Sequence, residues 1–379
     1  MALSDIRKEI DKIDERLVDL LCDRMALSKM VAEEKAKTGT VVLDSARESQ
    51  ILAQVARLSG PELEDYLQQI YGSIFDASKA YQYQNMHKDT GFAAFLQGAL
   101  AQSPAAFPKA ATVACQGVPG SYSQLAAEKL FDTPLITFFN NFDSVFAAVD
   151  QGLCQYGVLP IENSSYGSVG PVYDLMKNHN FYIARAVRLK VNHQLLGKPG
   201  ASLAHIHEIA SHPQALGQCS TFIKGMGNIK ITVCENTAMA AEMVARSQRR
   251  DLACIASPQC AELYNLSVIC HEIQISDHNY TRFICISKNI QVYPGSNKIS
   301  LMLSLPHKKA SLYRLLAKFA SLGLNLTKIE SRPIPGSDFE YMFYLDIEGD
   351  LRNPKVIKML SQLSSGPDQF SFFGNYLET

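Results

Sequence analysis

The chain has 379 residues, 47% of them hydrophobic and 19% charged, which predicts two or three globular domains with ample core. The formal net charge is −1 and the basic residues form no stripe, so we expect no nucleic-acid partner. The N-terminus lacks an apolar signal core, and the longest uncharged stretch, 90–108, is broken by Gln, Ser and Pro residues, so we expect a cytoplasmic protein without membrane contact.

The first expected element is a long helix over about 4–37. Its apolar residues step along one heptad seam, formed by Ile6, Ile10, Ile13, Leu17, Leu20, Leu27 and Val31. Arg24 stands where this series should continue, and a buried guanidinium is costly unless anions meet it. Lys35 follows three turns later on nearly the same face, about 16 Å further along the axis. A buried ion pair, a register device or an anionic ligand would each explain Arg24.

Two further helices are expected after a turn. Asp44 is suited to N-cap the second helix, which places Arg47 and Glu48 in its first turn. Ser78 and Gln82 lie beside the apolar face of the third helix, at i, i+4 spacing. The three helices thus carry cations, a carboxylate and neutral hydrogen-bonding groups that suit a small dicarboxylate with a hydroxyl group.

Residues 1–90 resemble the all-helical chorismate mutase domain. The residues that fall on that family's active-site pattern are Arg7, Arg24, Lys35, Asp44, Arg47, Glu48, Ser78 and Gln82. The resemblance implies that Arg7 and Arg24 clamp the two carboxylates of chorismate, that Lys35 and Gln82 reach its ether oxygen, and that Glu48 takes the ring hydroxyl. Rearrangement to prephenate needs no nucleophile, metal or cofactor, because holding a compact conformer and stabilising charge on the ether oxygen are sufficient.

The first helix should be too long for the two shorter helices to cover, since it spans roughly 50 Å at 1.5 Å per residue. We therefore expect a second chain to cover it in a homodimer or a higher homo-oligomer. The resemblance agrees, because such mutases share the long helix between protomers, and Arg7 would act in the partner's site.

A linker is expected over 91–111, where the sequence is rich in Ala and Pro. Beyond it, β-rich runs alternate with helical stretches, which predicts an α/β domain over 112–290. The expected strands are 112–114, 156–159, 206–210 and 229–233, and the expected helices are 123–129 and 238–246. The nine cysteines include no C-x-x-C pair, so we expect reduced thiols in the core and no metal site.

Polar side chains follow three of these strands, and a fourth cluster leads into a further β-rich run at 284–286. Ligands gather at such strand ends in α/β proteins. Each polar cluster alone is typical of a locally capped loop. The residues singled out are Ser123, Glu162, Asn163, Ser164, Ser211, Gln218, Thr281 and Arg282.

In this order, the four clusters resemble prephenate dehydratase over 112–290. The resemblance implies two α/β lobes around a cleft, similar to periplasmic binding proteins, with Thr281 as the candidate catalytic hydroxyl and the other residues at the substrate. Prephenate must lose its ring carboxylate as carbon dioxide and its ring hydroxyl as water, so the leaving hydroxyl needs a proton donor. Thr281 would act as a positioned hydrogen-bond donor, while His212 and His278 are stronger acids and stay as alternatives. No cofactor is expected.

The last stretch, 297–379, is expected to form a ferredoxin-like βαββαβ unit. Its strands should be 299–305, 325–333, 339–347 and 370–374, and its helices 310–321 and 354–363. Glu330, Ser331, Arg332 and Pro333 match the phenylalanine-binding signature of the regulatory ACT domain. The family's second signature usually reads Gly-Ala-Leu-Val, and residues 310–313 of this chain keep only its leucine, Leu312. Ala310 replaces the glycine, which would permit close approach of a ligand. We therefore expect weakened feedback binding of L-phenylalanine, and a structural dimerisation module is the alternative.

The three resemblances together predict a multidomain bifunctional enzyme: all-α mutase helices, a bilobal α/β dehydratase and an α+β ACT domain. It would convert chorismate to prephenate and prephenate to phenylpyruvate in L-phenylalanine biosynthesis. A mutase fused to prephenate dehydrogenase would need a nicotinamide site, and no G-x-G-x-x-G follows a strand. An effector-binding regulator that uses the bilobal and ACT domains as sensors is a rival of another class. The sequence leaves open the assembly size beyond a dimer and whether prephenate passes directly between the sites.

Overall fold

The computed structural model describes residues 2–38, 44–86, 91–305, 307, 311–334, 341–364 and 369–379. Ala310, on which the expected weakening of phenylalanine binding depends, lies outside these residues. The chain divides into two compact units. One contains 1–97, 305–322 and 354–368, and the other contains 98–304, 323–353 and 369–379.

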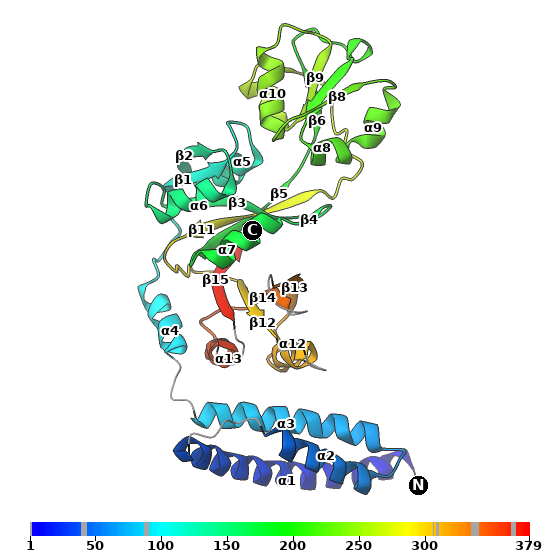
Figure 1. Cartoon of the computed structure of the whole chain (residues 1–379), viewed down its shortest axis with the longest axis vertical. Helices are drawn as coiled ribbons and strands as arrows, with labels where there is room; N and C mark the ends of the chain where they lie inside the picture. The colour runs from blue at the N-terminus through cyan, green and yellow to red at the C-terminus, as the bar shows by residue number, and fades with distance from the viewer. Residues whose placement is uncertain are drawn as a thin grey trace. The chain divides into compact units, whose positions relative to one another are not determined.

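Three helices form the N-terminal part of the first unit, and α3 packs along both α1 and α2 (Figure 1). They are α1 (Leu3–Thr38), α2 (Ser45–Ser59) and α3 (Glu64–Met86). The ends of α1 are within one residue of those that the apolar periodicity predicts. The predicted N-cap of α2 is confirmed, because Asp44 Oδ1 accepts the backbone N–H of Arg47 at 2.9 Å.

The apolar seam of α1 is not the face that its own chain covers. The seven seam residues have exposed fractions between 42% and 64%. The buried residues of α1 are instead Ser28 and Ala32. Ser78 of α3 donates a hydrogen bond to the sulfur of Met25, one turn from Ser28, so α3 packs on the face next to the seam. A strong apolar signal therefore marks a surface that one chain leaves open.

A helix, α4 (Phe92–Gln102), occupies half of the stretch expected as a linker. Its sequence is rich in Ala and Leu, which favour helix, and Leu96 is fully buried. The remaining helices of the first unit are α12 (Ser311–Ser321) and α13 (Pro354–Ser364). No described helix has both the length and the apolar content needed to cross a bilayer.

The second unit is built on two sheets. The larger sheet has ten strands in the order β13-β14-β12-β15-β5-β11-β3-β1-β2, with β4 paired to β3. Its strands are β1 (Ala110–Gln116), β2 (Thr133–Phe139), β3 (Tyr156–Asn163), β4 (Gly167–Ser168), β5 (Tyr182–Lys190), β11 (Tyr280–Ser287), β12 (Lys298–Ser304), β13 (Leu326–Pro333), β14 (Tyr341–Glu348) and β15 (Phe370–Glu378).

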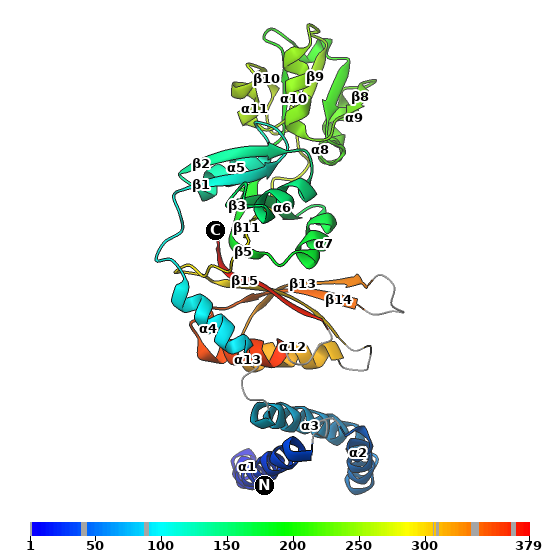
Figure 2. The same cartoon turned by 60° about the vertical axis from the view of Figure 1, so that its left-hand side comes forward.

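The smaller sheet has five strands in the order β10-β6-β9-β7-β8, and α10 lies against β9 and β7 (Figure 2). These strands are β6 (Gln194–Gly197), β7 (Glu208–Ser211), β8 (Lys230–Val233), β9 (Leu252–Ala256) and β10 (Ser267–Cys270). The chain passes between the two sheets twice, from β5 to β6 through 191–193 and from β10 to β11 through 271–279. The second unit therefore has two α/β lobes joined by two crossings.

Helices connect the strands of both lobes. They are α5 (Tyr122–Leu130), α6 (Phe142–Asp150), α7 (Gly170–Asn178), the short 3-10 turn η1 (Leu203–His205), α8 (Pro213–Gln218), α9 (Ser220–Gly225), α10 (Thr237–Arg246) and α11 (Pro258–Leu263). The expected strands and helices between 112 and 246 are all present, because their β-branched runs and capped helical stretches form locally. Along β1, Ala114 joins one apolar cluster while Val113 and Cys115 join another, so both faces of this strand are buried. All nine cysteines are free thiols, and six of them are buried.

The C-terminal elements follow the predicted order β12, α12, β13, β14, α13, β15, and their strands pair antiparallel. β15 is longer than predicted, because Leu377 and Glu378 continue past β12 and pair with β5. A Cβ atom on Gly374 would lie 2.6 Å from the Ile183 carbonyl oxygen, so only glycine permits this approach. The extension joins the C-terminal strands to β5 and its neighbours in one sheet.

Candidate active sites and the ion cluster between their strands

Arg24 is half-buried between α1 and α3. Its Nη1 donates a hydrogen bond to the buried hydroxyl of Ser78, and its guanidinium carbon lies 5.7 Å from the centre of the Phe75 ring. In the described part of this chain, no carboxylate forms an ion pair with Arg24. Its charge is therefore available to an anionic ligand.

Glu48 of α2 forms an ion pair with Lys79 of α3, a residue that sequence reasoning missed. Lys79 Nζ lies 2.8 Å from Glu48 Oε1 and 3.2 Å from Asp76 Oδ1. Lys79 follows Ser78 directly in α3, and this adjacency was the available signal. Gln82 Oε1 is buried and has no hydrogen-bond partner within the described ranges, so it can accept from a ligand or a partner chain.

The other predicted mutase residues lie further out. Arg47 is exposed, and its Nη1 donates to Gln50 at 3.3 Å. Lys35 is half-buried near the end of α1. Arg7 is exposed and precedes Arg24 by about 25 Å along the same helix, so one chain does not bring the two arginines together.

The dehydratase candidates Asn163 and Thr281 meet where β3 pairs with β11. Asn163 Oδ1 accepts the backbone N–H groups of Ser165 and Tyr166 at 3.0 and 3.1 Å, which fixes the orientation of its amide. Its Nδ2 then donates to Thr281 Oγ1 at 2.9 Å. Because the threonine oxygen accepts this bond, the hydroxyl hydrogen of Thr281 remains available to a ligand.

Asn279 completes this buried group, and sequence reasoning did not assign it. Asn163 Nδ2 also donates to Asn279 Oδ1 at 2.9 Å, and Asn279 is only 2% exposed. Its own Nδ2 is buried without a partner among the described residues. Asn279 and Thr281 are two residues apart, and this period-two spacing at the start of a strand was the available signal.

Two of the predicted serines already use their hydroxyl hydrogens inside the protein. Ser164 Oγ donates to the His278 carbonyl at 2.9 Å and accepts the backbone N–H of Tyr280 at 2.9 Å. Ser211 is fully buried, and its Oγ donates to the Ile255 carbonyl at 2.6 Å. Both hydroxyls therefore stabilise the backbone around them through hydrogen bonds.

Gln218 is held by the first crossing between the lobes. His193 Nε2 lies 2.6 Å from Gln218 Oε1, and the backbone N–H of His193 donates to Gln274 Oε1 in the second crossing at 2.9 Å. Burial lowers the pKa of His193, although the hydrogen bond to Gln218 opposes this shift. The neutral tautomer that suits this contact donates from Nε2 to Gln218, and Nδ1 is buried without a partner in the described structure.

Gly117 and Gly120, which have positive φ angles, lie between β1 and α5, and Ser123 is buried in the first turn of α5. Ser121 occupies the N-cap position, but its hydroxyl makes no cap hydrogen bond and is buried without a partner in the described part of the chain. This hydroxyl and the N-terminus of α5 together can receive a carboxylate.

The two alternative proton donors have different surroundings. His212 caps α8, with Nδ1 accepting the backbone N–H of Gln214 at 3.2 Å, and burial lowers its pKa. His278 is exposed beside Ser164.

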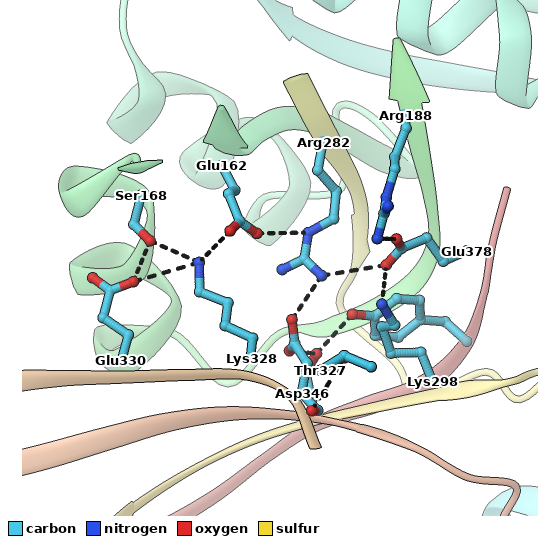
Figure 3. Close-up of polar contacts among 12 residues, drawn as sticks. Glu162, Ser168, Arg188, Arg282, Lys298, Thr327, Lys328, Glu330, Asp346 and Glu378 are labelled. Atoms are coloured by element: carbon cyan, nitrogen blue, oxygen red, sulfur yellow. Dashed lines mark hydrogen bonds and ion pairs between the residues drawn. The ribbon is translucent and has the colours of Figure 1, made fainter. Parts of the chain in front are cut away.

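Glu162 and Arg282 point away from the Asn163–Thr281 pair. The register pairs Glu162 with Arg282 directly beside the pairing of Asn163 with Thr281. Because successive side chains along a strand point to opposite faces, the two pairs lie on opposite faces of the sheet. Both residues were expected to contact the substrate, but the structure places them in contact with the C-terminal strands (Figure 3).

We call this group the ion cluster. It holds four cations and four carboxylates, namely Arg188, Arg282, Lys298, Lys328, Glu162, Glu330, Asp346 and Glu378 (Figure 3). Arg282 Nη1 lies 2.6 Å from Asp346 Oδ2 and 3.3 Å from Glu378 Oε2. Burial alone would raise the pKa of Glu378, but the hydrogen bond from Lys298 and the charge of Arg282 lower it overall.

The predicted phenylalanine-binding residues of β13 are partly engaged in contacts within the second unit. Glu330 accepts a hydrogen bond from Ser168, and Arg332 Nη1 donates to the Gly170 carbonyl at 2.7 Å and to Asp174 at 2.9 Å. Ser331 and Pro333 alternate with them and are exposed. Leu312 is half-buried in the first turn of α12, in the first unit.

Comparison with known proteins identifies both domains. Residues 113–291 match the family model for prephenate dehydratase, and residues 6–83 match the model for chorismate mutase type II. The bifunctional chorismate mutase/prephenate dehydratase of Enterobacter agglomerans is 30% identical, covering 98% of this chain and 95% of its own length. Arogenate dehydratase/prephenate dehydratase 2 of Arabidopsis thaliana is 36% identical over 70% of this chain and 72% of its own.

Two solved structures resemble a large part of this chain. A prephenate dehydratase from Arthrobacter aurescens in complex with L-Phe is 26% identical with a TM-score of 0.64, covering 70% of this chain and 90% of its own. GqqA, described as a quorum quenching acylase, is 30% identical with the same TM-score of 0.64, covering 71% and 98%.

The fold and the two family matches define an enzyme in which mutase helices precede a dehydratase of two α/β lobes. The chain belongs to the bifunctional chorismate mutase/prephenate dehydratase family. It therefore combines an isomerase and a lyase in one polypeptide.

Proposed function

We propose that the helical domain converts chorismate to prephenate, that the Asn163–Thr281 pair converts prephenate to phenylpyruvate, and that the enzyme serves L-phenylalanine synthesis in the cytoplasm. The observation that carries this proposal is that two complementary sites stand in one chain. Arg24 lacks a carboxylate partner in the described chain, and Thr281 has an uncommitted hydroxyl hydrogen. The product of the first reaction is the substrate of the second.

In the mutase step, fixed cations would hold chorismate in its compact conformer. Arg24 binds one carboxylate and is oriented by Ser78. Lys35 and the amide N–H groups of Gln82 stabilise the negative charge that develops on the ether oxygen as the C–O bond breaks and the new C–C bond forms. Lys79 orients Glu48 toward the ring hydroxyl. All atoms stay in one molecule, so the site supplies only position and charge.

In the dehydratase step, the bond between the ring and its carboxylate breaks, and carbon dioxide leaves. The electron pair of that bond aromatises the ring and expels the ring hydroxyl, which takes up one proton and departs as water. Thr281 donates a hydrogen bond to this leaving oxygen, while Asn163 holds the threonine oxygen. The unpartnered amide nitrogen of Asn279 gives a second donor beside it. The substrate carboxylates are received by Ser121 and Ser123 at the N-terminus of α5, and by Gln218.

Prephenate is the dehydratase substrate that we propose, although several relatives are named arogenate dehydratases. Those relatives match about 70% of this chain. Because the mutase domain produces prephenate, a dehydratase in the same chain receives it without an intervening amino transfer.

The exposed seam of α1 supports a homodimer. Seven apolar residues on one helix face are exposed in a single chain, and a second copy offers the same self-complementary face. Arg7 would then act in the partner's site, because it lies about 25 Å from Arg24 on its own helix.

The C-terminal strands support an ACT regulatory domain that binds L-phenylalanine. The antiparallel order β13-β14-β12-β15 is that of a ferredoxin-like sheet, and Glu330 to Pro333 lie in β13. Feedback would require phenylalanine to favour one arrangement of the domain over another, since equal affinity for both shifts nothing.

A turnover assay tests the proposal. The purified full-length chain should convert chorismate to phenylpyruvate without added nucleotide, and prephenate should appear as the intermediate. A chain that binds phenylalanine but turns over neither chorismate nor prephenate would instead be an effector-binding regulator.

A further inference from the structure

The ion cluster lies on the face of the sheet opposite to the Asn163–Thr281 pair. Glu162 precedes Asn163 in β3, and Arg282 follows Thr281 in β11. Each is fixed by a charge from the C-terminal strands: Lys328 Nζ lies 3.2 Å from Glu162, and Asp346 lies 2.6 Å from Arg282. Figure 3 shows Glu162 and Arg282 pointing toward Lys328 and Asp346. The C-terminal strands therefore form ion pairs with Glu162 and Arg282, which are next to the proposed catalytic pair in the sequence.

The Arg282–Asp346 contact is removed from water, whereas the Glu162 side chain that meets Lys328 is 35% exposed. The side chains of Arg282 and Asp346 are only 7% and 8% exposed. In such surroundings a charge that loses its partner must move or be neutralised, because its desolvation is no longer offset. Arg282 keeps its charge when a partner is lost, because a guanidinium does not deprotonate in proteins. Loss of Asp346 should therefore cause Arg282 to move, and with it the β11 strand.

Movement of β3 or β11 reaches the reacting group directly. Asn163 and Thr281 share a backbone segment with Glu162 and Arg282, and they are joined by a single 2.9 Å hydrogen bond. A displacement of about 1 Å in a catalytic group costs about 100-fold in rate.

We infer that Glu162 and Arg282 are positioning residues for the dehydration, and that Lys328 and Asp346 of the C-terminal strands hold them in place. The inference rests on the proposed role of the Asn163–Thr281 pair. It makes the C-terminal strands a structural part of the dehydratase site, through ion pairs with the reverse face of its strands.

The first test replaces the two anchors in the full-length chain. Asp346→Asn and Lys328→Met remove charge and preserve much of the shape. We expect kcat on prephenate to fall about 10- to 100-fold and KM to stay within about two-fold, because the substrate contacts remain while the hydroxyl is displaced. Lys328→Arg keeps the cation and should restore most of the rate. Thermal unfolding of each variant identifies any that fails to fold.

Asp174→Asn is the matched control. It removes the Arg332–Asp174 ion pair of 2.9 Å, which also joins the C-terminal strands to the dehydratase domain. Asp174 lies on α7, which carries neither Asn163 nor Thr281. We therefore expect kcat on prephenate to be unchanged in this variant.

A double variant tests whether Lys328 acts through Glu162. Glu162→Gln combined with Lys328→Met should be no slower than Glu162→Gln alone, since one contact is lost in both cases. Independent, additive losses would overturn the inference, as would an equal loss in Asp174→Asn. A rise in KM that is confined to Glu162→Gln would also overturn it, because that result places the side chain on the substrate.

The outcome separates this inference from the proposed function. If Thr281→Ala turns over prephenate at the wild-type rate, the catalytic pair is misassigned and both fail. If Thr281→Ala is inactive while Asp346→Asn and Lys328→Met match the wild type, the proposed function stands and only the positioning role is refuted.

Discussion

At the scale of single residues, we expect the mutase reaction to require Arg24. Arg24→Ala should abolish chorismate turnover while dehydratase activity on supplied prephenate persists. Removing a charged clamp costs about 2–5 kcal/mol, or roughly 30- to several thousand-fold in rate. Separate assays with chorismate and with prephenate check this. Equal loss of both activities would mean that Arg24 supports the fold rather than the substrate.

Thr281 should have the converse effect. Thr281→Ala is expected to stop the dehydratase and spare the mutase, so that prephenate accumulates from chorismate. Thr281→Ser keeps the hydroxyl that Asn163 positions, and it should retain part of the rate. Product analysis by chromatography distinguishes the two steps. Near-normal activity in Thr281→Ala, with an inactive His212→Ala or His278→Ala, would assign the proton donor to that histidine.

His193 makes stability depend on pH. Burial lowers the pKa of His193 in the folded state, while the pKa of an ordinary histidine is about 6.5. Between these two pKa values the unfolded chain binds more protons, so the free energy of unfolding should fall as the pH drops below about 6.5. His193→Gln keeps an amide donor for Gln218 but does not titrate, and it should flatten this fall.

Chemical denaturation of both proteins at pH 7.5 and 5.5 measures the difference. If the wild type and His193→Gln lose the same stability over this interval, other groups account for the pH dependence.

At the scale of secondary-structure elements, the exposed seam of α1 should be a dimer interface. Leu17→Glu places a charge in the seam, and we expect it to lower the molar mass measured by light scattering and to reduce mutase activity by at least about ten-fold, since burying an unpaired charge is costly. Val18→Glu is the matched control, because Val18 is also exposed but lies about 100° around the helix. Unchanged mass in Leu17→Glu would mean that another surface holds the chains together.

At the scale of the whole molecule, the proposed phenylalanine site includes Arg332, which already has a contact inside the chain. Arg332 is held by Asp174, so Asp174→Asn should release it and tighten phenylalanine binding by about two- to five-fold, the range expected for a partly exposed ion pair. Calorimetry on the wild type and Asp174→Asn measures this. If neither protein gives a heat of phenylalanine binding, the C-terminal strands are a structural module. Equal affinities for phenylalanine would show that the Asp174 contact of Arg332 does not limit binding.

Local signals predicted the elements that form locally. The apolar periodicity placed α1 to within one residue, Asp44 caps α2, and the C-terminal elements follow the predicted order. The stretch expected as a linker contains α4, because its Ala-rich and Leu-rich segment is itself a good helix former. Lys79 and Asn279 were missed, since each gains its meaning only from a partner on another element.

The sequence by itself determined the order of the domains, the residue types of both sites and the classes of chemistry, because motifs and hydrophobic periods are written along the chain. Only the tertiary structure decided which way the residues of the Thr281 region point. The register of β3 and β11 directs Asn163 and Thr281 to one face and Glu162 and Arg282 to the other, where charges from β13, β14 and β15 meet them. Strand pairing across more than a hundred residues sets that register, and no local pattern contains it.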